Sequence, residues 1–190
     1  KGVEFEDVRL TQEEWGAAKQ AGTYTAVGGS LPSFIEDDGT KRNQGMAILH
    51  YLSMKHGAAP QTAEELYEQN WYLETVKDHE KPALFTCIFQ EGVEEEKLNE
   101  FVANIKALYD KMETRWADGR AHASGANITT ADYYLLAGYT SVATNPGLKN
   151  PVISQQLGEY VNGLVHVKRV IDNIKAPLQG AVDALPATWI

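Results

Sequence analysis

The residues with the clearest chemical potential are Gln44 and Gly45, at a predicted helix start in the stretch NQGMAIL. The first turn of a helix has backbone N–H groups without helical partners and carries the positive end of the helix dipole, so it attracts a carboxylate. The side-chain amide of Gln44 could donate a hydrogen bond to the same anion. This pattern is typical of a carboxylate site, and equally of an ordinary solvated helix start.

Leu31 and Pro32, in the stretch SLPSF, form a second candidate feature close to the first in the chain. A proline is tolerated at a strand start because the ladder does not need its missing N–H group. A cis bond between the two residues would turn the backbone of Leu31 outward, where its N–H and C=O could pair with an extended peptide. The dipeptide alone does not establish a function.

The elements that must position these residues are a β-hairpin and a helix. Asp38-Gly39 is the turn signal between two short predicted strands. A helix is then predicted from about Gln44 to His56, with Gly57 as its C-terminal stop. Upstream, apolar residues alternate over residues 3–10 with one interruption, which predicts a strand with a bulge. The first part of the chain is therefore predicted to be mixed α/β.

After residue 57 the pattern is helical throughout. Amphipathic helices are predicted over residues 62–80, 94–116, 127–139 and 152–173. Thr62 with Glu65, and Thr129 with Asp132, have capping-box spacing, a folding element that contributes about 0.5 to 2 kcal/mol. The sequence predicts an α/β domain over residues 1–57, followed by an all-α helical domain over residues 58–190.

Composition excludes several classes of partner. The chain has 190 residues, of which 43% are hydrophobic, so it can bury a substantial core. Its net charge of -9 argues against nucleic acid or an anionic membrane surface as the main partner. No apolar run approaches the roughly 18 residues of a membrane span, and the N-terminus does not resemble a signal peptide. We expect a soluble cytoplasmic protein.

The single cysteine, Cys87, excludes an internal disulfide and any CxxC pair, which favours a reducing compartment. Because it lies in an apolar run, we expect a buried thiol that acts as a small hydrophobe rather than a reactive one. The five histidines show no metal-ligand spacing, so no metal is predicted.

Taken together and in order, these segments resemble the cytosolic glutathione transferase family. GVEFEDVRL resembles the second strand of the family, GSLPSF its cis-proline strand, DDGTKRNQGMAILHYL its hairpin and following helix, and ITTADYYLLAGY its capping-box helix. The last segment most resembles the pi, mu, alpha and sigma branch. The resemblance runs through nearly the whole chain. It implies a thioredoxin-like N-terminal domain that binds glutathione, an all-helical C-terminal domain that lines the electrophile site, and a two-fold homodimer.

Residue roles follow from the same resemblance. Leu31 would pair its backbone with the cysteinyl part of glutathione, and Pro32 would hold the cis bond that allows this pairing. Gln44 and the helix start at Gly45 would receive the γ-glutamyl carboxylate. The family normally has serine at the position of Gly45. Because a hydrogen bond to a charged group contributes about 1.5 to 3 kcal/mol, its loss would weaken glutathione binding roughly ten- to a hundredfold.

Three further residues have implied roles. Trp15 and Lys19 resemble the Trp and Lys of the family that contact the glycyl end, although two residues are inserted between Trp15 and Pro32. Asp78 is the candidate for the acidic residue that approaches the γ-glutamyl amine from the partner subunit.

The first strand and first helix of the family, which carry its catalytic Tyr, Ser or Cys, have no counterpart in this sequence. In this fold that strand lies inside the sheet, and its neighbour would otherwise have unpaired ladder groups. We therefore expect the sequence to be an incomplete version of a longer polypeptide, with the catalytic residue upstream of Lys1. A Tyr or Ser there indicates an enzyme of the conjugating kind, and a Cys indicates thiol transfer or reductase chemistry.

Two functional hypotheses remain. The first is a glutathione transferase for detoxification, which conjugates the thiol of its co-substrate glutathione to small hydrophobic electrophiles. The second is a transferase-like protein without efficient catalysis, which serves as a binding or structural subunit of a larger assembly. The loss of a hydroxyl at Gly45 and the apparent gap at the start would allow the second.

Overall fold

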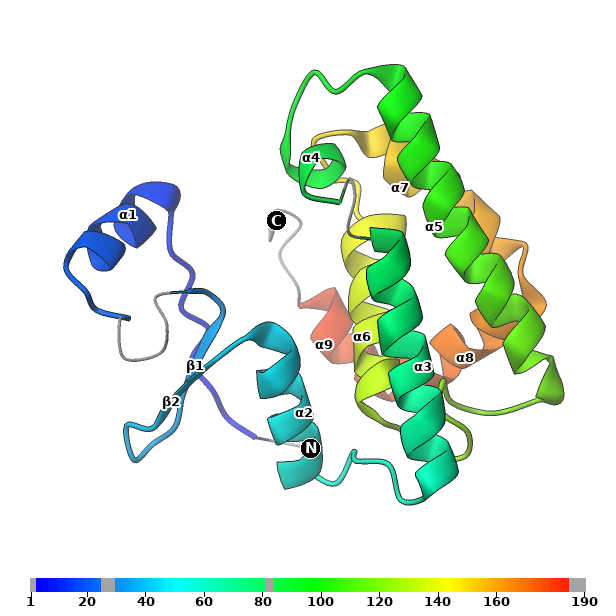
Figure 1. Cartoon of the computed structure of the whole chain (residues 1–190), viewed down its shortest axis with the longest axis horizontal. Helices are drawn as coiled ribbons and strands as arrows, with labels where there is room; N and C mark the ends of the chain where they lie inside the picture. Colours follow the sequence, from blue (N-terminus) through cyan, green and yellow to red (C-terminus); the bar gives the residue numbers. More distant parts are fainter. Residues whose placement is uncertain (1–2, 25–29, 81–83, 185–190) are drawn as a thin grey trace. The chain divides into compact units, whose positions relative to one another are not determined.

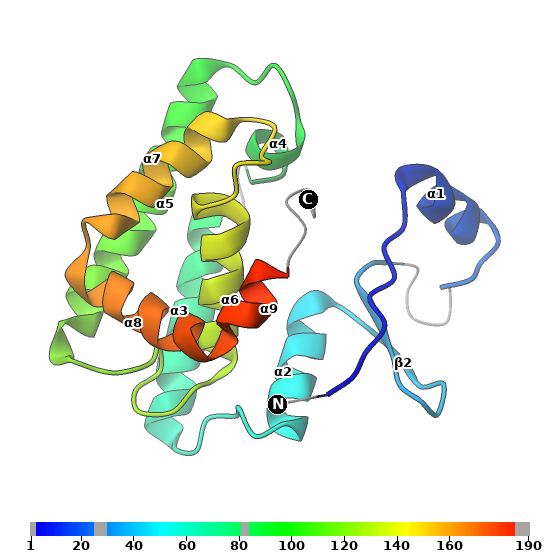
Figure 2. The ribbon, with the colours of Figure 1, turned by 180° about the vertical axis from the view of Figure 1, so that it is seen from behind.

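A computed structural model describes residues 3–24, 30–80 and 84–184 of the chain. The chain divides into two compact units, Lys1–Ala59 and Pro60–Ile190. Figures 1 and 2 show strands and helices in the first unit and helices in the second. The predicted fold class, a small α/β unit followed by an all-helical one, is confirmed.

The first unit begins with helix α1, Gln12–Gln20. Thr11 caps this helix, because its hydroxyl oxygen accepts the N–H of Glu14 at 3.2 Å and the Glu14 carboxylate accepts the N–H of Thr11 at 2.7 Å. These two bonds form a complete capping box. The capping-box spacing that marks two of the later helix starts is thus also present at Thr11 and Glu14, although no helix is predicted there from the sequence.

The predicted hairpin is confirmed. Strand β1, Ser33–Ile35, pairs antiparallel with strand β2, Lys41–Asn43, and Ser33 lies opposite Asn43. Gly39 in the turn has a φ of 83°, which a residue without Cβ adopts at little cost. Helix α2, Gly45–Lys55, follows directly. The chain therefore passes from the hairpin into a helix start within two residues.

The predicted strand over residues 3–10 is wrong. These residues form no strand, and the apolar side chains of Val3, Phe5 and Val8 are 54%, 81% and 63% exposed. Among the described residues the sheet consists of β1 and β2 alone. Alternating apolar residues form a strand only where a neighbouring strand completes the ladder and a core covers one face. The described part of the chain offers neither to this segment.

The second unit is a helical bundle. Its longest helices are α3, Ala63–Glu80, and α5, Glu95–Arg115. The other elements are α4 (Leu84–Phe89), η2 (Trp116–Asp118), α6 (Thr130–Gly138), η3 (Tyr139–Ala143), α7 (Pro151–Asn162), α8 (Val165–Lys175), η4 (Ala176–Leu178) and α9 (Gln179–Asp183). Helices α3, α5, α6, α7 and α8 pack together, and side chains from each are fully buried between them.

The single helix predicted over residues 152–173 is also wrong, because the chain breaks between α7 and α8. The carboxylate of Glu113 on α5 accepts backbone N–H bonds from Val165, His166 and Val167, each at 2.9 Å. These are the groups that a helix start leaves without helical partners, so Glu113 stabilises a new helix start at this point. This stabilising residue lies about fifty positions earlier in the chain than the helix start that it holds.

The capping box at Thr129 and Asp132 is confirmed. Asp132 is fully buried, and its carboxylate accepts the N–H of Thr129 at 2.7 Å and the N–H of Ala123 at 2.9 Å. Nδ1 of His122 lies 3.3 Å from the same carboxylate. The box therefore holds both the start of α6 and the loop before it.

Cys87 on α4 is fully buried, and burial raises the pKa of its thiol, as expected for a structural cysteine. No helix in the described part of the chain is both long enough and apolar enough to cross a lipid bilayer.

Candidate functional site

The strand start at Pro32 and the helix start at Gly45 lie against each other within the first unit. The peptide bond between Leu31 and Pro32 is cis, as the family resemblance implies. A Cβ atom placed on Gly45 would lie 3.5 Å from Cγ of Pro32, which is van der Waals contact. The side-chain amide of Asn43 donates to the hydroxyl of Ser30 over 3.2 Å and joins the two segments just before these residues.

The four residues predicted for this place, Leu31, Pro32, Gln44 and Gly45, are all exposed. The first helical hydrogen bond of α2 runs from the N–H of Ile48 to the carbonyl of Gln44. The first turn contains no acidic residue, and Gln44 makes no capping bond to it. Its leading N–H groups therefore remain available for an anion from outside the helix, which is what a carboxylate site requires.

Gln44 itself has an unusual backbone conformation, with φ 68° and ψ 102°. A non-glycine residue with positive φ is strained by about 1 to 3 kcal/mol, and such residues gather at binding and catalytic sites. The conformation places the amide-bearing residue directly before the open helix start.

A charged cluster holds α2 against the hairpin. Glu36, which follows β1, accepts hydrogen bonds from Lys55 at 2.7 Å and from the hydroxyl of Tyr51, and it pairs with Arg42 at 3.3 Å. Lys55 and then Tyr51 lower the pKa of Glu36 through these hydrogen bonds. The guanidinium of Arg42 lies 4.0 Å from the centre of the Tyr51 ring. The helix start thus keeps its position relative to the strands that precede it.

The remaining predicted site residues lie elsewhere. Trp15 and Lys19 are on α1, where the Trp15 ring packs on Tyr24 at 5.6 Å and Lys19 is exposed. The hydrogen bonds and ring contacts of the described residues do not join either of them to Pro32 or the α2 start. Asp78 is exposed on α3 in the second unit. The roles of these three residues stay predictions.

Comparison with known proteins extends the argument beyond this geometry. No protein-family model matches the chain. Glutathione S-transferase S1 of Drosophila melanogaster is 27% identical over 98% of this chain and 71% of its own length. Glutathione S-transferase 3 of Caenorhabditis elegans is 31% identical over 62% of this chain and 64% of its own length. The chain is thus similar, over much of its length, to glutathione S-transferases of an insect and a nematode.

Solved structures of glutathione S-transferases share the fold of this chain. The crystal structure of Na-GST-3 of Necator americanus, described as a monomeric glutathione S-transferase, matches with a TM-score of 0.75 at 23% identity. The match covers 100% of this chain and 88% of that one. The first unit of this chain accordingly corresponds to the thioredoxin-like part of the fold, and the second to its helical part.

Sequence reasoning missed some polar groups of this chain that only the fold brings together. The cluster around Glu36 joins the residue after β1, Arg42 in the middle of β2 and two residues of α2, and no local spacing indicates it. Glu80 and Tyr134 meet in the core of the second unit from helices far apart in the chain. Among the described residues, no group of three or more His, Cys, Asp or Glu side chains is placed to hold a metal ion.

Proposed function

We propose that this chain binds glutathione at Leu31, Pro32, Gln44 and Gly45 as part of a glutathione transferase that acts on small hydrophobic electrophiles. The contact between the cis-proline strand start and the open start of α2 carries the proposal. A bound γ-glutamyl carboxylate would accept N–H bonds from the α2 start and from the amide of Gln44. The backbone of Leu31 would pair with the cysteinyl part, with Trp15 and Lys19 proposed for the glycyl end.

The chemistry of conjugation is a nucleophilic displacement. A thiol with a pKa of about 8.5 becomes mostly thiolate near neutral pH when a hydrogen-bond donor lowers that pKa by one or two units. The thiolate sulfur then attacks the electrophilic carbon, a C–S bond forms, and the leaving group departs with the bonding electrons. Binding both reactants on one protein supplies the proximity contribution. We assign the activating donor to no residue of this chain.

Glutathione-agarose retention and conjugation of a chromogenic aryl chloride test this function together. We expect retention that free glutathione reverses, and release of chloride as the conjugate forms. Gln44→Ala should weaken retention, whereas Gln155→Ala, an exposed glutamine on α7, should not. Equal retention of both variants would contradict the assignment of the site.

The transferase-like binding subunit remains the second candidate, and the missing side chain at Gly45 favours it. Retention of the full-length protein on glutathione-agarose, without conjugation of any aryl chloride, would support this candidate. Failure of the wild-type protein to bind glutathione would contradict both candidates.

We further propose a cytoplasmic homodimer of the pi, mu, alpha and sigma branch, with a role in detoxification. In that dimer Asp78 of one subunit would approach the γ-glutamyl amine bound to the other. Light scattering measures the mass in solution. If the protein is dimeric, Asp78→Asn should weaken glutathione binding without changing the mass; a monomeric mass would contradict the dimer and this role of Asp78.

A further inference from the structure

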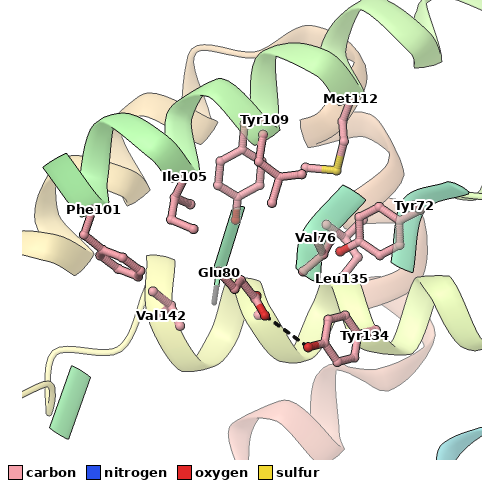
Figure 3. A pocket seen from close by; sticks show the side chains of 12 residues that line it. Tyr72, Val76, Glu80, Phe101, Ile105, Tyr109, Met112, Tyr134, Leu135 and Val142 are labelled. Carbon is pink, nitrogen blue, oxygen red and sulfur yellow. Dashed lines mark hydrogen bonds between the residues drawn. The ribbon is translucent and has the colours of Figure 1, made fainter. Parts of the chain in front are cut away.

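The helical unit contains a cavity of about 30 Å³ between α3, α5 and α6, shown in Figure 3. A space of this size is large enough for at least one group of the size of a water molecule. Most of the lining is apolar, and the polar part of the wall consists of Glu80, Tyr72, Tyr109 and Tyr134. Every lining residue belongs to the second unit, so the cavity does not depend on the glutathione site.

Glu80 is the residue that makes this cavity unusual. It is the last residue of α3, where the helix dipole disfavours a negative charge. Tyr134 on α6 donates a hydrogen bond to Oε2 of Glu80 over 3.1 Å, and burial raises the pKa of the carboxyl group. Among the described residues, no lysine, arginine or histidine forms an ion pair with it. A carboxylate that is largely removed from water in this position lacks the positive partner that such charges generally require.

Aromatic rings surround the carboxyl group. Tyr72 and Tyr109 are only 3% and 5% exposed. Within the part of the chain that the structure describes, neither hydroxyl has a hydrogen-bond partner. In Figure 3 the hydroxyl of Tyr109 points toward Glu80, and the dashed line joins Glu80 to Tyr134. Tyrosine hydroxyl oxygens accept hydrogen bonds, and aromatic rings attract cations through their negative faces.

We propose that this cavity binds the head group of a small primary ammonium ion, with Glu80 as its counter-ion. The three hydrogens of the ammonium group would be donated to the carboxylate and to tyrosine hydroxyl oxygens. Its first methylene group would contact the apolar wall, which includes Val76, Ile105 and Leu135. Glu80, Tyr134 and Gly138 are partly exposed, so this side of the wall gives the alkyl chain a way out of the second unit. This ligand class goes beyond the proposed glutathione function.

Two other occupants fit less well. A water molecule or a neutral alcohol could satisfy the hydroxyl groups, but neither compensates the charge of an ionised Glu80. An anion would meet a carboxylate and no positive group on the described wall. The preference for a cation therefore rests on Glu80 alone, which makes it directly testable.

The proposal predicts how the affinity for an ammonium ion depends on pH. Tyr72 from α3, Tyr109 from α5 and Tyr134 from α6 face Glu80, and burial raises the pKa of each, so all three stay neutral at moderate pH. Asp132, at the start of α6, also contributes to the raised pKa of Tyr72 and is held in the capping box. Ammonium binding should tighten as pH rises through the pKa of Glu80, and weaken only when the amine itself loses its proton near about pH 10.

Calorimetric titration of the protein with n-butylammonium chloride tests the site, and n-butanol serves as the uncharged probe of similar shape. Glu80→Gln removes the charge and keeps the shape, and Glu74→Gln is the matched control, because Glu74 is an exposed residue of the same helix. We expect the wild type and Glu74→Gln to bind n-butylammonium equally. Glu80→Gln should bind it at least about tenfold more weakly, since a charged hydrogen-bond partner is lost. Butanol should bind at least about tenfold more weakly than n-butylammonium to the wild type.

Equal binding by the two variants, equal binding of butanol, or no heat of binding with the wild type would each overturn the proposal. The last result would indicate a cavity filled by water only. If Glu80→Gln does not fold, the pH series on the wild-type protein decides the question. An affinity for n-butylammonium that does not change between about pH 4 and pH 8 would then refute a role for a carboxylate, whose ordinary pKa is about 4.3.

Discussion

Gly45→Ser restores the hydroxyl that the glutathione transferase family normally has at the start of α2. The structure has room for it, because a Cβ at this position would lie 3.5 Å from Cγ and 3.9 Å from Cδ of Pro32. These are ordinary contact distances, so neither the proline nor the helix must move. Gly45 also has no left-handed backbone conformation that a side chain would strain.

The expected gain follows from the type of bond. A hydrogen bond from a hydroxyl to a charged carboxylate contributes about 1.5 to 3 kcal/mol, which corresponds to roughly a ten- to hundredfold tighter complex. Replacing glycine near a helix start also stabilises the folded chain by about 0.5 to 1 kcal/mol, whatever the new side chain. The gain in protein stability must be separated from the gain in glutathione affinity.

Gly45→Ala separates the two effects, because it adds the Cβ without the hydroxyl. We would titrate the wild type and both variants with glutathione by calorimetry and measure their unfolding in urea. Both variants should unfold at higher urea concentration than the wild type, and only Gly45→Ser should bind glutathione more tightly. If serine and alanine give the same affinity, the carboxylate does not lie at this helix start, and the assignment of Gly45 is wrong.

Three further predictions concern the helical unit. Gly158→Ala should destabilise the protein by about 1 to 3 kcal/mol in thermal unfolding, because its Cβ would lie 2.8 Å from the backbone oxygen of Ala143. Thr129→Ala should lower the free energy of unfolding, measured in urea, by about 0.5 to 2 kcal/mol, because the helix cap is lost. A smaller loss would contradict the role of the capping box. The carboxylate of Asp132, 3.3 Å from Nδ1 of His122, raises the pKa of His122 in the folded protein, so the contribution of this pair to stability is complete below about pH 6.5 and is lost as pH rises through the raised value. His122→Asn should therefore destabilise the protein more at low pH than at high pH, and an equal effect in urea unfolding at both would refute this coupling.

Local signals in the sequence predict much of this fold. The turn at Asp38-Gly39 and the capping box at Thr129 depend on residues within a few positions of each other, and both are confirmed. The capping box at Thr11 has the same local signal, so α1 also could have been predicted. The cis bond before Pro32 needed the family resemblance, because the dipeptide alone is compatible with either isomer.

Elements that depend on distant residues could not be predicted in the same way. The break between α7 and α8 is stabilised by Glu113, which lies on another helix. The segment at residues 3–10 has the alternation of a strand, but alternation does not show whether a neighbouring strand is present. From the sequence, Glu80 is only a polar residue at the end of an amphipathic helix. The packing of α3 against α5 and α6 shows that it faces a cavity. Tertiary contacts decide each of these cases.

The candidate glutathione site shows a further mismatch between residue type and backbone. Gln44 adopts a φ of 68°, which glycine would adopt with little strain, while the glycine itself stands one position later, where the backbone and the surrounding space accept a side chain. Folding alone would favour the opposite order of these two residues. The strain at Gln44 is explained if its amide serves a ligand. Around Gly45, the residues that the structure describes leave space for a side chain, so in the proposed site this glycine would change how strongly glutathione binds rather than how the site is built.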